Sequence, residues 1–244
     1  DIQRIEVVPQ SGADYDAASS GGIIKITTKR RLDSGLMGSA SLVANGTKGA
    51  YNIMPSVSLN YNSGKVNAYG RLWAGTNGSD YTTEEHTDYT SNTVIDAETE
   101  MDERSTWAGG NLGVVYDITN RHSVGAELQY NYWGSNGDTE TWTERSLNGI
   151  TSRSDGIYDD KGRNYMITAT LNYIYKLDDK GSTLKFIGDY TNNLSSSSNN
   201  YFDTNCDDLS APLITRDSTY RQASRGKYQL GTATVALEKV LSPK

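Results

Sequence analysis

Alternation of apolar and polar side chains along long segments constrains this chain more than any other feature. Between Tyr51 and Tyr61 the odd-numbered residues are apolar or aromatic, and the even-numbered ones are mostly Asn and Ser. The same period-two pattern recurs in residues 122–134, 163–177 and 182–195. It is typical of a β-strand with one polar and one apolar face. We therefore predict an all-β fold with eight antiparallel strands, at 36–46, 50–62, 65–76, 106–117, 122–134, 163–177, 182–195 and 227–239.

The links between these predicted strands alternate between short and long. Three are short and rich in turn-forming residues, at 62–65, 118–121 and 178–181. The links after the third, fifth and seventh predicted strands are long and polar, and we predict irregular loops for them. Short turns on one side and long loops on the other are typical of outer-membrane β-barrels. The strand lengths also agree, since a tilted strand needs about 9–11 residues to cross a bilayer.

Composition supports a membrane sheet and argues against other classes of protein. Hydrophobic residues make up 35% of the chain, yet 17 Tyr and 4 Trp argue against disorder. No segment has the apolar length of a transmembrane helix. The net charge is −7 and basic residues cluster only at 29–31, so we expect no nucleic-acid partner. Tyrosines on the apolar face near predicted strand ends suit a membrane interface, and they are Tyr51, Tyr61, Tyr116, Tyr130, Tyr132, Tyr165, Tyr173, Tyr175 and Tyr190.

No residue pattern in the sequence indicates an enzyme. Four acidic pairs fall in predicted loops, at 84–85, 102–103, 159–160 and 207–208. A catalytic carboxylate needs a pocket that shifts its pKa, and a solvated loop provides none. Asp203, Asp207 and Asp208 offer oxygen ligands that calcium accepts, but their order lacks the EF-hand spacing. We therefore predict no catalytic residue, no bound metal and no cofactor.

The polar faces of the predicted strands would line the inside of a barrel. The lumen-facing candidates are Asn60, Asn111, Glu127, Gln129, Asn131, Thr170, Asn172 and Asp189. Two interpretations stay open. One is a hydrated wall that packs against an internal domain, which we favour, and the other is the lining of a substrate path.

An ordered motif occupies the first thirty residues. Ile5-Glu6-Val7-Val8 is followed by Tyr15-Asp16 and then by Gly21-Gly22-Ile23-Ile24. This order resembles the end of the plug domain in TonB-dependent outer-membrane receptors, in the variant common in Bacteroidetes. Two positions depart from the family pattern, because Ser11 replaces its turn proline and Lys25 its strand asparagine. The rest of the chain adds only the plan of strands and turns.

The resemblance implies that residues 1–31 are the C-terminal end of a plug domain and residues 32–244 the N-terminal part of a transmembrane barrel. Such a barrel would have about 22 strands, of which this chain would hold about eight. The implied function is active import of a scarce solute across the bacterial outer membrane, with the long loops extracellular. The solute would be an iron chelate, a vitamin or an oligosaccharide. The implied partners are outer-membrane lipid, the TonB energy-coupling complex, reached through a segment that precedes this sequence, and a surface lipoprotein.

Two other classes of function stay open at this point. Eight strands also close a small barrel, so a non-transporting adhesin or structural protein is an alternative, although its narrow lumen has no room for a plug. A soluble β-sandwich that binds carbohydrate through Tyr and Trp on its loops would alternate as well. Short turns on one side only argue against the sandwich.

Overall fold

The computed structural model describes residues 2–8, 23–28, 34–210 and 215–240. Regular structure in these ranges consists of strands, namely β1 (Ile2–Val8), β2 (Ile23–Thr28), β3 (Gly35–Thr47), β4 (Ala50–Asn62), β5 (Val66–Tyr89), β6 (Thr93–Asp117), β7 (His122–Leu147), β8 (Ile150–Lys176), β9 (Thr183–Cys206) and β10 (Thr215–Glu238). Within the same ranges, no helix is long and apolar enough to cross a membrane.

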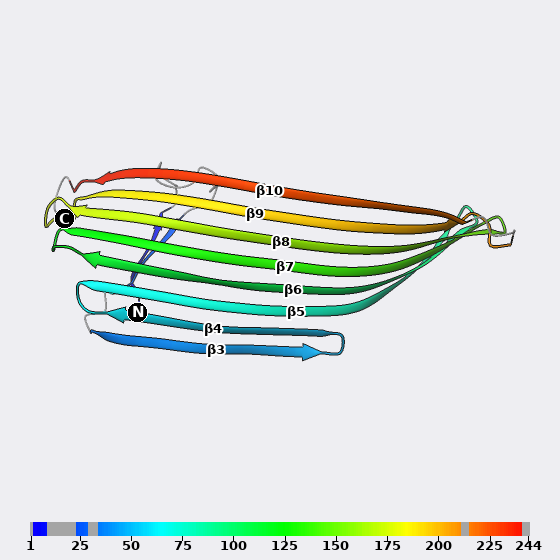
Figure 1. The fold of residues 1–244 in the computed structure, drawn as a ribbon, viewed down its shortest axis with the longest axis horizontal. Coiled ribbons are helices and arrows are strands. Elements are labelled where there is room, and N and C mark those ends of the chain that lie inside the picture. The colour runs from blue at the N-terminus through cyan, green and yellow to red at the C-terminus, as the bar shows by residue number, and fades with distance from the viewer. Residues whose placement is uncertain (1, 9–22, 29–33, 211–214, 241–244) are drawn as a thin grey trace.

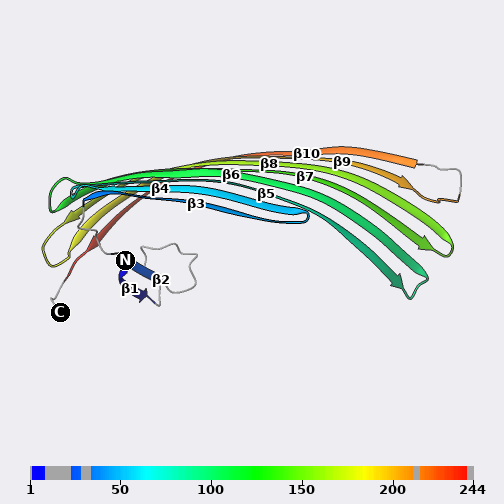
Figure 2. The ribbon, with the colours of Figure 1, turned by 90° about the horizontal axis from the view of Figure 1, so that it is seen from below.

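Strands β3 to β10 form one antiparallel sheet in which each strand pairs with the next along the chain. Figure 1 shows this up-and-down order, from blue β3 at one edge to red β10 at the other. Strands β1 and β2 form a separate antiparallel pair, and Figure 2 places that pair on the concave side of the large sheet. The antiparallel all-β fold predicted from the sequence is confirmed, but the eight strands form an open sheet and do not close into a barrel.

The short turns lie where the sequence predicts them. Strand β6 ends at Asp117 and β7 begins at His122, and the other two short turns agree to within one or two residues. Gly64 and Gly181 have φ angles of 79° and 104° in their turns. Glycine adopts this region freely because it has no Cβ to clash. Glycine therefore provides the tight turns that join β4 to β5 and β8 to β9.

The long links are not irregular loops, and that prediction is wrong. Strands β5 to β9 continue through them, reach 24 to 27 residues and pair to their tips. At the tip of β7–β8, Asn148 and Gly149 have φ angles of 51° and 84°, as a two-residue type I′ turn requires. We call the outer parts of these strands the hairpin extensions, residues 78–104, 136–161, 198–210 and 215–223.

The two faces of the sheet differ in side-chain exposure because the sheet is curved (Figure 2). Apolar side chains on the convex face splay apart into solvent, whereas the alternating polar side chains on the concave face are mostly half-buried. We call the apolar part of the convex face the apolar belt. Its central members are all 45% or more exposed, and they are Leu59, Leu72, Leu112, Leu128, Leu171 and Val235.

A single curved layer leaves the described strands without a hydrophobic core of their own. Cys206, at 7% exposure, is the one buried apolar side chain among the residues whose side chains the structure describes. The accessible surface is 17383 Å², whereas a compact monomer of 26.7 kDa exposes roughly 11,000 Å². A sheet with one apolar face must bury that face against something else. The surroundings of the apolar belt are therefore the central question about function.

Candidate functional site

The concave face carries every residue that we predicted to face a lumen. The registers place these residues on one face, and all but the exposed Asn60 are half-buried. Four of them lie in a single row of paired residues across the sheet, which we call the polar row, and they are Asn60, Glu127, Thr170 and Asp189. Asn111 is directly opposite Gln129. The last two lie opposite glycines in neighbouring rows, Asn131 opposite Gly109 and Asn172 opposite Gly125.

Tyr69 bridges two strands within that row. Its ring lies across Gly113 of the intervening strand, and its hydroxyl donates a hydrogen bond to Glu127. A Cβ added at Gly113 would stand only 2.2 Å from the Tyr69 Cζ atom. Glycine is therefore the residue that lets the aromatic ring lie flat on the sheet. This contact links β5 to β7 by side chains, beyond the backbone ladder.

Asp189 forms a second polar link in the same row. Its carboxylate accepts hydrogen bonds from the Thr170 hydroxyl at 2.7 Å and from the Thr232 hydroxyl at 3.2 Å. The three residues come from neighbouring strands β8, β9 and β10. Hydrogen bonds to a charged group are among the stronger ones in proteins. The row is consequently an ordered polar surface on the concave face.

Three tryptophans form an aromatic tier two to three concave rows further toward the hairpin extensions, on β5, β6 and β7, namely Trp73, Trp107 and Trp133. Two of them lie over glycines of the adjacent strand, since a Cβ at Gly75 would stand 2.2 Å from Trp107 and one at Gly109 would stand 2.7 Å from Trp73. Trp133 remains 45% exposed. An exposed indole with hydroxyl and amide neighbours can stack on a ligand ring. The tier thus adds binding capacity to the polar row.

A tyrosine ladder crosses the concave face of the hairpin extensions. Tyr158 and Tyr201 meet edge to face with ring centroids 5.4 Å apart, and Tyr201 stacks on Tyr220 at 4.4 Å. Tyr158 donates a hydrogen bond of 3.0 Å to Asp203. Burial, and then this hydrogen bond, raise the pKa of the Tyr158 hydroxyl above its ordinary value. The Tyr158 hydroxyl is therefore uncharged at neutral pH, and the ladder presents aromatic faces beyond the level of the apolar belt.

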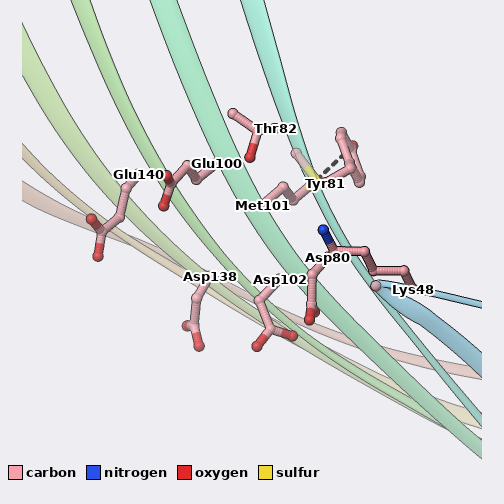
Figure 3. A pocket seen from close by; sticks show the side chains of 10 residues that line it. Lys48, Asp80, Tyr81, Thr82, Glu100, Met101, Asp102, Asp138 and Glu140 are labelled. Carbon is pink, nitrogen blue, oxygen red and sulfur yellow. Dashed lines mark hydrogen bonds between the residues drawn. The ribbon is translucent and has the colours of Figure 1, made fainter.

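A hollow of about 630 Å³ lies where the β3–β4 hairpin ends beside β5 (Figure 3). Asp80, Asp102 and Asp138 line it from adjacent strands and point to the same side in the figure. The Arg104 guanidinium lies 3.0 Å from the Asp102 carboxylate and offsets part of the repulsion. Like charges directly opposite each other destabilise a sheet. This row of aspartates is tolerated because water solvates the three carboxylates and weakens their repulsion.

The acidic pairs are placed differently from the prediction. Those at 84–85, 102–103 and 159–160 lie within strands β5, β6 and β8, not in loops. Consecutive strand residues point to opposite faces, so each pair is split between the two faces. Only the pair at 207–208 lies outside a strand. Carboxylates from different strands lie side by side in rows across the sheet. Pairs of adjacent residues in the sequence do not reveal these rows.

The three aspartates considered for calcium do not form one ligand set. Asp203 accepts the Tyr158 hydroxyl, while Asp207 forms an ion pair with Arg216. Asp208 accepts hydrogen bonds from Ser210 at 2.9 and 2.7 Å. In the part of the chain that the structure describes, no group of three or more His, Cys, Asp or Glu could hold a metal ion.

The motif at the start of the chain lies partly outside the described residues. Tyr15, Asp16, Gly21 and Gly22 fall in 9–22, and the predicted boundary at 31/32 falls in 29–33, both outside the described ranges. Ile23 and Ile24 lie in β2, opposite Val8 and Val7 of β1.

Sequence reasoning did not name the aromatic residues of the concave face as site candidates. Tyr69 and Trp73 alternate with the apolar residues of β5, and the same period-two pattern would have placed them. The tyrosine ladder had no such signal, because it lies in segments predicted to be loops. Neither a protein-family model nor a curated protein matches this sequence.

Proposed function

We propose that the eight-stranded sheet is part of the wall of a transmembrane β-barrel in the bacterial outer membrane, and that this barrel imports a scarce solute. The observation that carries the proposal is the apolar belt, which faces outward from a curved sheet and has tyrosines at both borders. Along β8 the convex residues run from Tyr175 and Tyr173 through Leu171 and Ile167 to Tyr165. Tyr enrichment at both edges of an apolar band is the pattern of a membrane-spanning barrel.

The height of the belt suits a bilayer. Ten residue steps separate Tyr165 from Tyr175, which corresponds to roughly 33 Å along the strand. A strand tilt near 40° reduces this to roughly 25 Å, the height of the outward apolar band in outer-membrane barrels.

The belt also shifts along the sheet, as tilted strands require. Tyr51 of β4 belongs to the belt but shares its row with the charged Arg104 of β6. On the other side, Lys227 of β10 shares its row with Tyr165 of β8, which still belongs to the belt. The belt thus moves toward the short turns from β4 to β10. A band perpendicular to the axis of a barrel crosses tilted strands at shifting residues in this way.

The open edges favour a barrel larger than eight strands. β3 and β10 each have one partner strand within the described sheet. Unpaired backbone groups in lipid cost several kcal/mol each, so a spanning sheet must be closed by further strands. A lumen wide enough for a plug needs many more strands than eight. This supports a plugged barrel of about 22 strands over the small, non-transporting barrel.

The concave face would then line the lumen and the substrate path. Its polar row, tryptophan tier and tyrosine ladder lie at successive levels from the membrane toward the hairpin extensions. Stacking aromatics and fixed hydrogen-bonding groups suit a solute with rings and polar edges, such as an oligosaccharide, a vitamin or an iron chelate. The resemblance of the first thirty residues to a plug ending adds energy coupling through a TonB complex and a surface lipoprotein partner to the proposal.

The hairpin extensions would project from the cell and the short turns would face the periplasm. A cysteine introduced at Asn148 in a Cys206→Ser background should react with a membrane-impermeant maleimide on intact cells. A cysteine introduced at Asn120, in a short turn, should react only after the cells are opened. The reverse pattern would invert this topology.

Uptake by intact cells tests the function directly. Deletion of the gene should abolish growth on one limiting solute of these three classes, and restoring the complete protein should rescue it. Rescue should fail when the proton motive force is dissipated or the TonB protein is removed. Unchanged uptake of all three classes with the protein in the outer membrane would favour an adhesin or structural barrel. A β-sandwich has two packed sheets, whereas β3 to β10 form one, so the structure does not support the sandwich alternative. Recovery of the protein in the soluble fraction would contradict the membrane location.

A further inference from the structure

Basic side chains gather on the convex face of β8 and β10, immediately beyond the apolar belt. They are Lys161, Arg163, Arg221, Arg225 and Lys227, and all five are exposed. We call this group the cationic strip. It is notable in a chain whose net charge is −7. The strip lies on the side of the belt that leads into the hairpin extensions.

Neutral hydroxyl groups separate the two halves of the strip. The register places Ser196 of β9 directly between Arg163 and Arg225, and it places Ser198 opposite Lys161. Arg221 donates a hydrogen bond of 3.3 Å to the Ser198 hydroxyl. The centre of the strip therefore offers hydrogen-bond donors and no negative charge.

Asp159 lies on the same face, two positions from Lys161 and in the row of Arg221, but it forms no ion pair with the strip. At the same level of the convex face on β6, Arg104 is paired with Asp102 at 3.0 Å. Among the residues that the structure describes, no carboxylate is within ion-pair distance of any member of the strip. Five unpaired cations on one surface repel one another, and an external anion would relieve that repulsion.

The position of the strip along the strands indicates which kind of anion would bind to it. Arg163 lies two positions before the border residue Tyr165, on its hairpin-extension side, which is roughly 7 Å along the strand. Lipid headgroups occupy roughly 5–8 Å beyond the hydrocarbon on each side of a bilayer. The guanidinium groups of the strip would therefore lie at the level of lipid phosphates. This step rests on the proposed membrane location of the sheet.

We propose that the cationic strip binds the phosphate groups of lipid headgroups in the outer leaflet, such as those of lipid A. Arg163 and Arg225 are two strands apart, a separation of roughly 10 Å that admits one phosphate between them. Arginine binds phosphate through two parallel N–H groups, and the Ser196 hydroxyl completes the site with a further donor. The lipid would then cover β9 and fix the orientation of the β8–β10 side of the wall.

Binding of bisphosphorylated lipid A to the complete protein in zwitterionic detergent tests the proposal. The double variant Arg163→Gln/Arg225→Gln should weaken binding roughly 25-fold, about fivefold for each cation. The matched control is Arg104→Gln, which removes an ion-paired cation at the same level and should change binding less than twofold. The charge-preserving variant Arg163→Lys/Arg225→Lys should retain most of the affinity. The wild-type protein should bind dephosphorylated lipid A as weakly as the double variant binds the intact lipid, and inorganic phosphate should not compete.

The outcomes separate this inference from the proposed function. Equal binding of phosphorylated and dephosphorylated lipid A by the wild-type protein would overturn the inference, even if every substituted variant failed to fold. Equal binding by the double variant and the wild type would overturn it as well, while solute uptake and outer-membrane fractionation would still support the import function. Absence of the wild-type protein from the membrane fraction would instead contradict the proposed function. It would also contradict the membrane location on which the lipid-binding inference rests.

Discussion

The inner and outer halves of strand β8 differ sharply although they form one continuous ladder. Between 163 and 176 the convex face carries Tyr165, Ile167 and Leu171, whereas between 150 and 162 it carries charged residues such as Asp159 and Lys161. The backbone pairing with β7 and β9 is the same in both halves. The hydrogen-bond ladder therefore forms the strand in both halves, and the convex side chains match the surroundings of each half. Hydrocarbon around the inner half and water around the outer half would explain both.

The largest expected effect comes from placing a charge on the convex face of each half. Leu171→Arg should cost about 2–4 kcal/mol, because it buries a charge near the middle of the hydrocarbon layer. Ile157→Arg, on the same strand and face but in the hairpin extension, should cost under about 0.5 kcal/mol. Leu171 and Ile157 are 61% and 46% exposed in the isolated chain, so burial within the sheet does not separate them.

Assembly of the complete protein, followed as heat-resistant folded barrel in gels, measures this difference. Thr170→Arg, on the concave face beside Leu171, is a second control and should assemble far better than Leu171→Arg. Equal loss from Leu171→Arg and Ile157→Arg would mean that the two halves of β8 share the same surroundings.

A smaller effect should follow from crowding the concave face of the inner half. Gly113→Ala would place its Cβ 2.2 Å from the Tyr69 ring, which should displace the ring and break its hydrogen bond to Glu127 at a cost of about 1–3 kcal/mol. Gly188→Ala, on the convex face of β9, is the uncrowded control, because its nearest neighbour is 3.7 Å away on Phe186. It should be neutral or slightly stabilising. Denaturant midpoints of the two variants provide the comparison, and equal midpoints would show that Tyr69 does not need Gly113.

The smallest effect concerns the tip of the outer half of β5–β6. His86 lies 2.5 Å from Asp96 and 3.4 Å from Asp88, and hydrogen bonds to Asp96 and then Asp88 raise its pKa above the ordinary 6.5. A raised folded pKa means that the stabilisation is complete below the unfolded pKa and is lost as pH rises through the folded value. Amide hydrogen exchange at 86–96 should therefore be slower near pH 6 than near pH 8, after correction for the intrinsic rate.

Asp96→Asn should remove most of this pH dependence, whereas the β7–β8 tip at Asn148 and Gly149 has no histidine and should show none. The effect is confined to the tip because His86 is exposed and water screens its charge. A tip that is equally protected at both pH values would show that the imidazole pairs too weakly to order it.

The contrast between the two halves also explains what the sequence could and could not predict. In the inner half, Leu128 or Leu171 alternates with polar residues, so the period-two pattern located strands, faces and short turns to within a few residues. In the outer half both faces are polar, and a strand such as 150–162 has the composition of a loop. Alternation along the sequence was enough to predict that Asn60 and Asp189 lie on the same face. Predicting the tyrosine ladder would also require the register between β8, β9 and β10, which the sequence pattern does not give.

A spin-label scan along the convex and concave faces of β8 would show whether the apolar belt lies in lipid. Single cysteines at positions 153 to 175, in a Cys206→Ser background of the complete protein, would be labelled in native outer membranes. Accessibility to oxygen and to a water-soluble nickel chelate would then be compared. We predict that from 165 to 173 the odd-numbered positions are accessible to oxygen and shielded from nickel, with the even-numbered positions showing the reverse, and that from 153 to 161 both sets are accessible to nickel. Nickel accessibility at positions 167, 169 and 171 equal to that at 157 and 159 would contradict a belt in lipid.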